Sequence, residues 1–516
     1  MSRTEAARNH DRLSPPVRAL LQQAEGCPDM TVLVAGQDKW SSKRLAEQAG
    51  RLAAGLADRD VRPGDRVALH MHNTAEATLA HLACLRLGAV AVPLNTRLAT
   101  PELHNLVSRV RPKIYLGQDN LYPQFAPVPE DLMPEEARFL SGPAEAADTE
   151  PWPGLAADDT GLAHPESAPD TPALLLATSG TTGESKIAVW TRRTLDALGL
   201  SAEGRGIGKG DVITVMVPLM HTAGTYLLFN ALTQGATAVL IRQFDAADVL
   251  DAIERDGITT VIGLPFMYAE LTREQRSRPR DVSTLRTAVS FGDVCPAGVE
   301  ADFGCVFRVT LRSAWAATED CGMTILDART GPYIKVIPQA RAEVLRPDGR
   351  TADRGEIGEL VTRSPTTIPG YWRGPGHYAP LPGGVFRTGD LARELGPGLL
   401  EFMGRKKDLI IRGGSNISPQ EVEEVLRAHP DVIDAGVAGY PDDTLGQRVG
   451  ALVVLADRAS PAPSAEQIRA WAVQRLADYK VPERIRTVHA VPRNSLTKIN
   501  RPAITAALSV PKQKPA

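Results

Sequence analysis

The sequence predicts a multi-layer α/β protein with a large N-terminal domain, an antiparallel β subdomain and a small α+β domain at its C-terminal end. A chain of 516 residues is longer than one hydrophobic core usually organises, which favours at least two domains. Apolar segments with helical and strand spacing alternate in the first hundred residues and again from residue 173 to about 325. A strand-rich, glycine-punctuated section over 334–402 predicts the antiparallel part.

The first alternation is clear in the sequence itself. Leucines and alanines recur at helical spacing over 41–58, and the turn sequence 61–65 leads into the apolar run 66–70. A helix over 76–87 then precedes a strand over 88–94. Strands that alternate with helices are typical of largely parallel sheets, so this part is predicted to form one.

Two further stretches differ from that alternation. Residues 123–172 are rich in Pro, Ala, Asp and Glu, which predicts surface loop and short irregular helix. Beyond Gly404 the sequence predicts a self-contained domain of about one hundred residues. Its expected elements are the helix 419–428, the strands 432–439 and 449–455, the helix 465–478 and a final strand near 485–491.

Charge and composition limit the possible partners. The formal charge of −3 gives no bulk attraction to nucleic acid or to anionic membranes, so small-molecule partners are expected and nucleic acid is not. A polar segment 1–15 and the lack of a long apolar run predict a cytoplasmic protein without a membrane span. Five cysteines without a Cys-x-x-Cys pair predict reduced thiols rather than disulfides or a zinc site.

The most informative segment is a loop of glycines and hydroxyls behind an apolar strand. It reads Thr178-Ser179-Gly180-Thr181-Thr182-Gly183-Glu184-Ser185-Lys186. Glycines let backbone N–H groups approach an oxyanion, hydroxyls donate further hydrogen bonds, and the lysine adds a positive charge. Its spacing is not that of the ordinary P-loop. Taken alone, the loop is equally compatible with phosphate binding and with a flexible connector.

Six more motifs follow in order along the chain. They are Pro218-Leu-Met-His221-Thr-Ala-Gly224, Trp315-Ala316-Ala317-Thr318-Glu319, Phe386-Arg387-Thr388-Gly389-Asp390, Gly404-Arg405-Lys406-Lys407-Asp408, Arg412-Gly413-Gly414-Ser415-Asn416-Ile417 and 492–501 with Lys498. With the loop, they resemble the adenylate-forming superfamily of acyl-CoA synthetases, peptide-synthetase adenylation domains and beetle luciferases. The resemblance spans residues 41–501 approximately. Within the superfamily, the sequence resembles the acyl-CoA synthetase or carboxylic acid–CoA ligase branch.

The resemblance implies an ATP- and Mg²⁺-dependent enzyme that converts a carboxylic acid to acyl-AMP with release of pyrophosphate and then forms a thioester with coenzyme A. An adenylating enzyme that hands acyl-AMP to a carrier protein or a separate thioesterifying enzyme is the alternative. Two further alternatives are a luciferase-like oxygenase and a regulatory nucleotide-binding protein. Retention of Lys186, Glu319, Asp390, Arg405 and Lys498 speaks against the regulatory protein. Assembly as a homodimer is left open.

The implied site residues make chemical sense, because the carboxylate and the α-phosphate are both anions and need cations and donors between them. By resemblance, Lys498 bridges the two anions, Thr318 contacts the α-phosphate and Glu319 holds Mg²⁺. Asp390 would bind the ribose hydroxyls, and Trp315 would contact the adenine. The implied nucleotide site comprises Thr178, Ser179, Gly180, Thr181, Thr182, Gly183, Lys186, Gly292, Asp293, Val294, Trp315, Asp390 and Arg405.

The implied acyl pocket contains several small residues, which favours a bulky aromatic, alicyclic or polycyclic acid. It comprises His221, Thr222, Ala223, Gly224, Ser290, Phe291, Ala316 and Ala317. No acidic residue occurs over 220–226 to pair with an ammonium group, so a free amino acid is not expected. The chain departs from the family pattern over 290–294, at Trp315-Ala316 and at Thr497, where glycine is usual.

By resemblance, residues 1–403 form an N-terminal AMP-binding domain and residues 404–516 a mobile C-terminal domain with a hinge near Lys407. Rotation about the hinge would exchange Lys498 for a loop containing Gly413, Gly414 and Ser415, which would line the coenzyme A tunnel. The anionic end of coenzyme A needs cations. Candidates are Arg412, Arg448 and Lys480.

Overall fold

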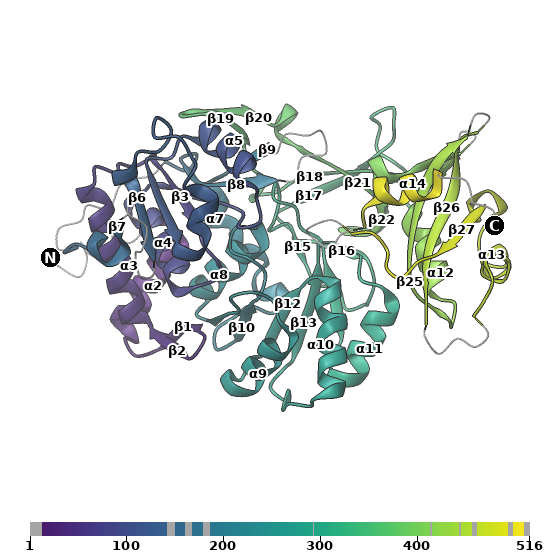
Figure 1. The fold of residues 1–516 in the computed structure, drawn as a ribbon, viewed down its shortest axis with the longest axis horizontal. Coiled ribbons are helices and arrows are strands. Elements are labelled where there is room, and N and C mark those ends of the chain that lie inside the picture. Colours follow the sequence, from purple (N-terminus) through teal and green to yellow (C-terminus); the bar gives the residue numbers. More distant parts are fainter. Residues whose placement is uncertain are drawn as a thin grey trace.

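The computed structural model describes residues 13–141, 150–159, 168–178, 186–292, 294–412, 415–442, 445–456, 462–493 and 499–509. These residues form two α/β layers, an antiparallel sheet and a separate C-terminal domain, so the predicted fold class is confirmed (Figure 1). In this part of the chain every helix is too short or too polar to traverse a lipid bilayer.

The first α/β layer is a nine-stranded sheet whose middle strands run parallel. In order, its strands are β20 (His377–Pro380), β19 (Gly370–Gly374), β9 (Lys186–Thr191), β8 (Pro172–Thr178), β4 (Val90–Pro93), β3 (Arg66–His70), β5 (Ile114–Gln118), β6 (Arg138–Ser141) and β7 (Glu150–Pro151). The predicted first helix and second helix are α3 (Ser42–Asp58) and α4 (Ala75–Leu87). The chain turns out of α4 at Gly88, whose φ of +75° favours glycine.

Strands β6 and β7 correct the expectation that 123–172 is only loop and short helix. The pattern was hidden because β6 begins with a charged residue that is nevertheless buried. The guanidinium of Arg138, only 2% exposed, donates to the carbonyl oxygens of Ala126, Val128 and Met133. These bonds replace water, so the cation can sit in the core beside Phe139.

The second layer is a seven-stranded sheet, parallel except for β2. Its strands are β14 (Leu311–Ala314), β13 (Thr287–Phe291), β12 (Thr260–Gly263), β10 (Val212–Val215), β11 (Thr237–Leu240), β1 (Thr31–Ala35) and β2 (Asp38–Ser41). The connecting helices include α8 (Thr222–Gln234), α9 (Ala246–Asp256), α10 (Pro265–Ser277) and α11 (Ala297–Phe307). The carboxyl ends of β10, β13 and β14 therefore lie at one edge, where open parallel sheets usually bind ligands.

The predicted antiparallel section is a six-stranded sheet. Its strands are β15 (Thr324–Ile325), β16 (Tyr333–Val336), β22 (Leu399–Arg405), β21 (Phe386–Gly396), β18 (Ile357–Arg363) and β17 (Arg341–Leu345). Two strands of the same section, β19 and β20, leave this sheet and extend the nine-stranded one through β9. That exchange ties the antiparallel sheet to the first α/β layer.

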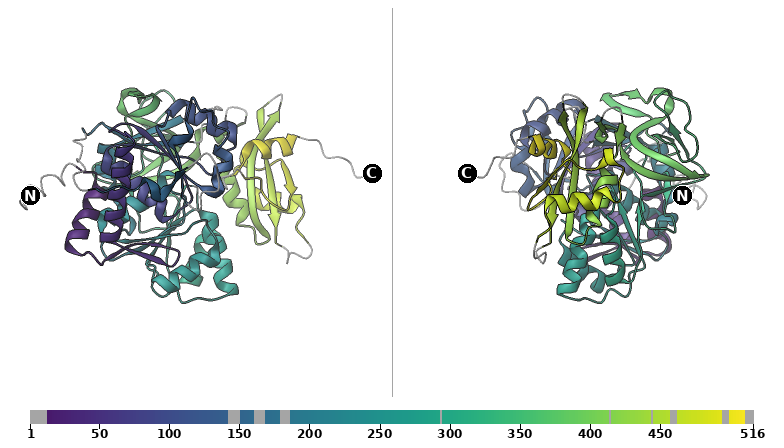
Figure 2. Two further views of the ribbon diagram at one scale, coloured as in Figure 1. Left: turned by 60° about the vertical axis from the view of Figure 1, so that its left-hand side comes forward. Right: turned by 90° about the vertical axis from the view of Figure 1, so that its right-hand side faces the viewer.

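The C-terminal domain stands beside the rest of the molecule in Figure 1 and in the left view of Figure 2. Its sheet consists of β24 (Ser415–Ile417), β23 (Ile410–Arg412), β26 (Gly446–Leu455), β25 (Val432–Asp442) and β27 (Arg484–Thr487). Its helices are α12 (Pro419–Arg427), α13 (Ala465–Val473) and α14 (Arg501–Ser509). Helix α13 ends before the predicted 478, and α14 was not predicted. A hydrophobic core of its own supports the domain, whereas the boundary at 403/404 stays a prediction.

A buried histidine in α4 gives the fold a testable pH dependence. His81 is 2% exposed, packs against the ring of Phe229, and donates from Nδ1 to the carbonyl of Ala77 at 2.7 Å. Burial lowers the pKa of His81 from 6.5 to about 4. Below pH 6.5 His81 thus binds a proton in the unfolded chain but stays neutral in the folded chain. Stability is therefore lost as the pH falls toward 4.

We expect the unfolding free energy to fall by about 2 kcal/mol from pH 7 to pH 5 because of His81 alone. Urea unfolding of the wild type and of His81→Leu at both pH values measures this, because other titrating groups are shared by the two proteins. The pH 7 to pH 5 loss should be smaller by that amount in His81→Leu. Equal losses in both proteins would show that His81 keeps its ordinary pKa.

Candidate active site

The predicted phosphate loop lies at the tip of the β8–β9 hairpin. Thr178, the last residue of β8, pairs with Lys186, the first residue of β9, and donates from Oγ1 to its carbonyl at 3.2 Å. The hairpin therefore places both ends of the loop side by side at the edge of the nine-stranded sheet. The loop residues Ser179, Gly180, Thr181, Thr182 and Gly183 lie outside the described residues.

Lys186 and Glu319 are brought together by a tyrosine that sequence reasoning missed. Pairing of β19 with β9 sets Tyr371 opposite Ala188. The Tyr371 hydroxyl donates to Glu319 Oε1 at 2.9 Å, and Lys186 Nζ lies 4.9 Å from the centre of the Tyr371 ring. The signal that could have found it is an aromatic residue in a strand that pairs with the strand after the loop.

The electrostatics of Glu319 suit a single-carboxylate magnesium site. Burial raises the pKa of Glu319, while the Tyr371 hydrogen bond and the nearby charges of Lys186 and Arg405 act in the opposite direction. No cluster of three metal-binding side chains occurs among the described residues. Mg²⁺ is commonly held by one or two carboxylates together with substrate phosphates, so the donor set around Glu319 fits this ion.

Thr318 and Glu319 are the central residues of a turn closed by a bridge between Ala317 and Asp320. The Thr318 hydroxyl accepts a hydrogen bond from Thr222 Oγ1 at 2.8 Å. That contact joins the turn to the start of α8, where His221 is the residue just before the helix. The positive end of α8 thus lies beside the turn, an arrangement that favours an anion.

Asp390 lies in a second polar group, 2% exposed. Its Oδ2 accepts from Trp315 Nε1 at 2.8 Å, and its Oδ1 lies 2.8 Å from Arg405 Nε. Register pairing of β21 with β22 sets Asp390 opposite Arg405. Both carboxylate oxygens of Asp390 thus already have a partner, and its binding of the ribose hydroxyls stays a prediction.

The segment expected at the adenine follows β13, next to the segment that carries Trp315. Ser290 and Phe291 pair with Ser313 and Ala314, directly before Trp315. Gly292 has a φ of +80°, and a Cβ there would lie 2.8 Å from the Leu264 side chain. A side chain at this turn would be strained, so glycine keeps the strand end open. Val294 is described, whereas Asp293 lies outside the described residues.

The family model of the AMP-binding enzymes matches residues 20–372. The model of the AMP-binding enzyme C-terminal domain matches residues 421–498. This chain belongs to the AMP-binding enzyme family. It is an AMP-forming ligase of the acyl-CoA synthetase type, a class that uses ATP, Mg²⁺ and coenzyme A. The predicted family and enzyme class are thereby confirmed.

Related proteins match the ligase over nearly its whole length. A feruloyl-CoA synthase of an Amycolatopsis species is 33% identical over 506 residues, 95% of this chain and 98% of the relative. The indoleacetate–CoA ligase of Aromatoleum aromaticum is 30% identical over 92% of this chain and 94% of the relative. The ATP-bound MatB structure from Rhodopseudomonas palustris has a TM-score of 0.84, 26% identity and coverage of 96% and 99% of the two chains.

An anthranilate CoA ligase, AuaEII, in complex with anthranoyl-AMP has a TM-score of 0.85 and 25% identity to the ligase. The match covers 96% of this chain and 97% of that one. Similarity over both domains means that the N-terminal site and the C-terminal domain are retained together.

Residues of the C-terminal site are only partly described. Lys498, Gly413 and Gly414 lie outside the described residues, as do Thr497 and the side chain of Ser415. The flanking backbone is described on both sides, since Arg493 forms a bridge with Ile499. The segment that contains Lys498 therefore starts and ends at neighbouring points of the domain.

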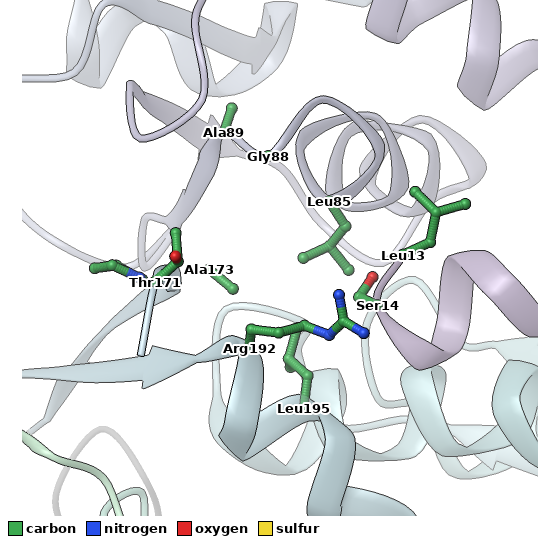
Figure 3. Close-up of a pocket in the computed structure, with 10 residues that line it drawn as sticks. Leu13, Ser14, Leu85, Gly88, Ala89, Thr171, Ala173, Arg192 and Leu195 are labelled. Atoms are coloured by element: carbon green, nitrogen blue, oxygen red, sulfur yellow. The ribbon is translucent and has the colours of Figure 1, made fainter. Parts of the chain in front are cut away.

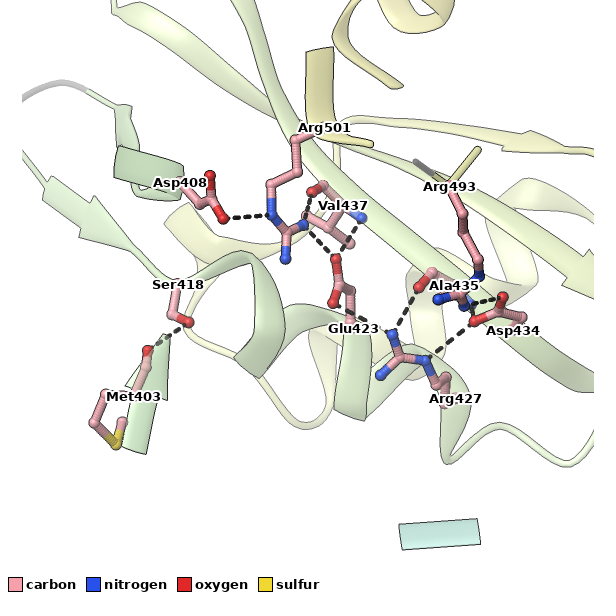
Figure 4. Close-up of polar contacts among 10 residues, drawn as sticks. All are labelled: Met403, Asp408, Ser418, Glu423, Arg427, Asp434, Ala435, Val437, Arg493 and Arg501. Carbon is pink, nitrogen blue, oxygen red and sulfur yellow. Dashed lines mark hydrogen bonds and ion pairs between the residues drawn. The ribbon is translucent and has the colours of Figure 1, made fainter. Parts of the chain in front are cut away.

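Two arginines on either side of that segment bind one carboxylate network (Figure 4). Arg493 binds Asp434 at 2.8 Å, and Arg501 binds the 1% exposed Glu423 at 2.5 Å and Asp408 at 3.3 Å. Arg427 lies 3.3 Å from Glu423 and 3.4 Å from Asp434. Both ends of the segment are thus attached to the same part of the domain.

Figure 3 shows a small cavity in the N-terminal part of the chain. It encloses about 20 Å³ between Leu85, Arg192 and Leu195, and it reaches Pro172 and Ala173 at the start of β8. The phosphate loop follows the other end of β8, about 20 Å away for a strand of this length. The volume admits about one water molecule, so this cavity is no substrate site.

We expect Tyr371→Phe to slow acyl-adenylate formation about tenfold and to raise the Mg²⁺ concentration needed for half-maximal pyrophosphate release, because it removes a hydrogen bond to a charged group. Trp372→Phe is the matched control. Its indole donates to the Arg109 carbonyl at 3.2 Å, so the control also loses one hydrogen bond. An unchanged Mg²⁺ requirement in Tyr371→Phe would separate Tyr371 from the magnesium site.

Proposed function

We propose that the ligase activates a bulky carboxylic acid, aromatic by preference, as its acyl-AMP and transfers the acyl group to coenzyme A. Relatives that act on feruloyl, indoleacetate and 2-succinylbenzoate groups support an aromatic acid. The single observation that carries the proposal is the meeting of Lys186, Tyr371 and Glu319 beside the Thr318 turn. These groups supply positive charge, hydrogen-bond donors and one carboxylate where two anions must approach.

Adenylation uses residues of the N-terminal part together with Lys498. Trp315 and Arg405 hold Asp390, which accepts the ribose hydroxyls and so fixes the nucleotide. The Thr318 hydroxyl and the start of α8 orient the α-phosphate toward the acid. Mg²⁺, when bound to Glu319, supplies charge neutralisation at the phosphates. Lys498 adds the cation between carboxylate and phosphate.

The acyl pocket is proposed to lie around the start of α8 and Ala316-Ala317. His221, Ala223, Ala316 and Ala317 are half-buried. Gly224 is small for a different reason, because a Cβ there would lie 2.3 Å from the carbonyl oxygen of Pro218. Its size serves backbone packing, so the three alanine side chains carry the argument for a bulky acid.

The second step uses the C-terminal domain. Rotation at Lys407 brings the loop with Gly413 and Gly414 toward the acyl-AMP. The cationic candidates for the coenzyme A phosphates already have carboxylate partners: Arg412 and Arg448 share Glu483, and Lys480 binds Glu421 at 2.6 Å. Binding coenzyme A at these cations therefore requires competition with Glu483 or Glu421.

A carrier-protein thiol is the second candidate acceptor. A fatty acid–[acyl-carrier-protein] ligase of Streptomyces coeruleorubidus is 28% identical over 96% of this chain. The adenylation site is the same for both acceptors, so the difference lies in the second step alone. Assembly as a homodimer stays a prediction.

The function is tested with ATP, Mg²⁺ and a panel of aromatic, alicyclic and fatty acids. We expect pyrophosphate release with an aromatic acid and, after addition of coenzyme A, AMP and acyl-CoA in equal amounts. Accumulation of acyl-AMP with coenzyme A unconsumed would point to a carrier protein. If none of the acids in the panel supports pyrophosphate release, the proposed substrate class is wrong.

Lys498→Ala should lower the rate of acyl-adenylate formation by about 10² to 10³, because a cation is lost where two anions converge. Thioester formation from pre-made acyl-AMP should change far less. The two half-reactions are measured separately by pyrophosphate release and by acyl-CoA formation. An equal loss in both would assign Lys498 to the whole cycle.

A further inference from the structure

Asp320 is a fully buried carboxylate surrounded by four hydroxyls. Its exposed fraction is 0%. Oδ1 accepts hydrogen bonds from Ser364 and from Thr366, the latter at 2.8 Å, and Oδ2 accepts from Thr362 and Thr367, each at 2.9 Å. Four donors fill the acceptor positions of a carboxylate, so Asp320 is held in one orientation. We call these four residues the hydroxyl cage.

Backbone groups fix the direction of three of these hydroxyls. Ser364 Oγ accepts from the Thr366 N–H at 3.0 Å, Thr366 Oγ1 from the Gly322 N–H at 3.0 Å, and Thr367 Oγ1 from the Ser364 N–H at 2.7 Å. A hydroxyl has a single proton, which each of these three can donate to the carboxylate, and Ser364 Oγ also lies 2.9 Å from Thr366 Oγ1. The cage therefore offers the Asp320 carboxylate hydrogen-bond donors from four side chains.

The charge of Asp320 is met by hydroxyl groups in the structure. Within the described part of the chain, neither a lysine nor an arginine forms an ion pair with it. Burial raises the pKa of Asp320, and the four hydroxyl hydrogen bonds act against that rise. Buried charges are costly unless they are paired or coordinate a metal, so an unpaired carboxylate in this place calls for a reason beyond packing.

The position of Asp320 in the chain supplies that reason. It closes the turn whose two central residues are Thr318 and Glu319, and it also bridges to Thr367. The N–H of Ile368 donates to the Glu319 carbonyl at 2.9 Å, and Tyr371 binds the Glu319 side chain. One segment, 362–371, thus holds the turn at Asp320 and the carboxylate of Glu319 at the same time.

We propose that Asp320 and the hydroxyl cage are positioning groups for adenylation, which hold the 317–320 turn so that Thr318 faces the α-phosphate and Glu319 faces Mg²⁺. The inference rests on the proposed adenylation function. Asp320 acts through Glu319 in two ways. It fixes the backbone of the turn, and its negative charge next to Glu319 strengthens the attraction of the site for a divalent cation.

The test is the Mg²⁺ dependence of ATP binding, measured by titration calorimetry without any carboxylic acid. Asp320→Asn keeps the shape of the side chain but removes the charge and half of its acceptor capacity. We expect the Mg²⁺ concentration that gives half-maximal ATP affinity to rise about tenfold. Pyrophosphate release at saturating ATP should fall by at least the same factor.

Asp211→Asn is the matched control. Asp211 is a partly buried aspartate whose carboxylate binds Arg286 and accepts from the Gly208 N–H, far along the chain from the turn. It should lower thermal stability without changing the Mg²⁺ requirement. If Asp320→Asn behaves in the same way, Asp320 is merely structural and the inference falls.

Thr367→Val gives a second, milder test if Asp320→Asn does not fold, because it removes one hydroxyl and keeps the shape. It should shift the Mg²⁺ requirement in the same direction by a smaller factor. A folded Thr367→Val with an unchanged Mg²⁺ requirement would overturn the inference. Wild-type protein that binds ATP with Mg²⁺ but activates no acid would contradict the proposed substrate and leave the Asp320 result to stand by itself.

Discussion

The hydrogen bond from Tyr371 to Glu319 joins parts of the molecule that otherwise have separate sheets. Tyr371 belongs to the nine-stranded sheet through β19, whereas Glu319 follows the edge strand β14 of the seven-stranded sheet. The antiparallel sheet contributes Asp390 and Arg405. The candidate site therefore exists only where three sheets meet, and each of them must be packed correctly for the polar groups to converge.

That constraint explains why so much buried polarity is found around the 317–320 turn. A turn between two sheets has no ladder of its own to fix it, so side chains supply the missing bonds. Asp320 meets the hydroxyl cage, Trp190 donates to the Thr318 carbonyl at 2.9 Å, and Thr222 donates to the Thr318 hydroxyl. Each bond comes from a different element, which makes the turn rigid from several directions.

The sequence predicted the parts of this arrangement that lie in contiguous motifs. Helical and strand periodicity identified α3, β3 and α4, and ordered motifs identified Lys186, Glu319 and Asp390. It missed β6, because the buried Arg138 looks like a surface charge until its carbonyl partners are known. It missed α14 as well, since a short C-terminal apolar pattern resembles a tail.

The contribution of Tyr371 and of the hydroxyl cage could not be read from the sequence for another reason. Tyr371 lies 52 residues from Glu319 and meets it only through the pairing of β19 with β9. The cage residues Thr366 and Thr367 lie 46 and 47 residues from Asp320. Threonines and serines near a proline are ordinary loop composition, and only the register of the sheets turns them into donors for one carboxylate.

The same reasoning applies to the link between the domains. Lys406 binds the buried Glu359 of the antiparallel sheet at 3.0 Å, and Asp408 lies 3.3 Å from Arg501 of the C-terminal domain. Ser418 donates to the Met403 carbonyl at 3.0 Å across the junction. Lys407 therefore lies between Lys406, which binds the antiparallel sheet, and Asp408, which binds the C-terminal domain. The hinge at Lys407 stays a prediction, and a rotation there would have to break the hydrogen bond from Ser418 to the Met403 carbonyl.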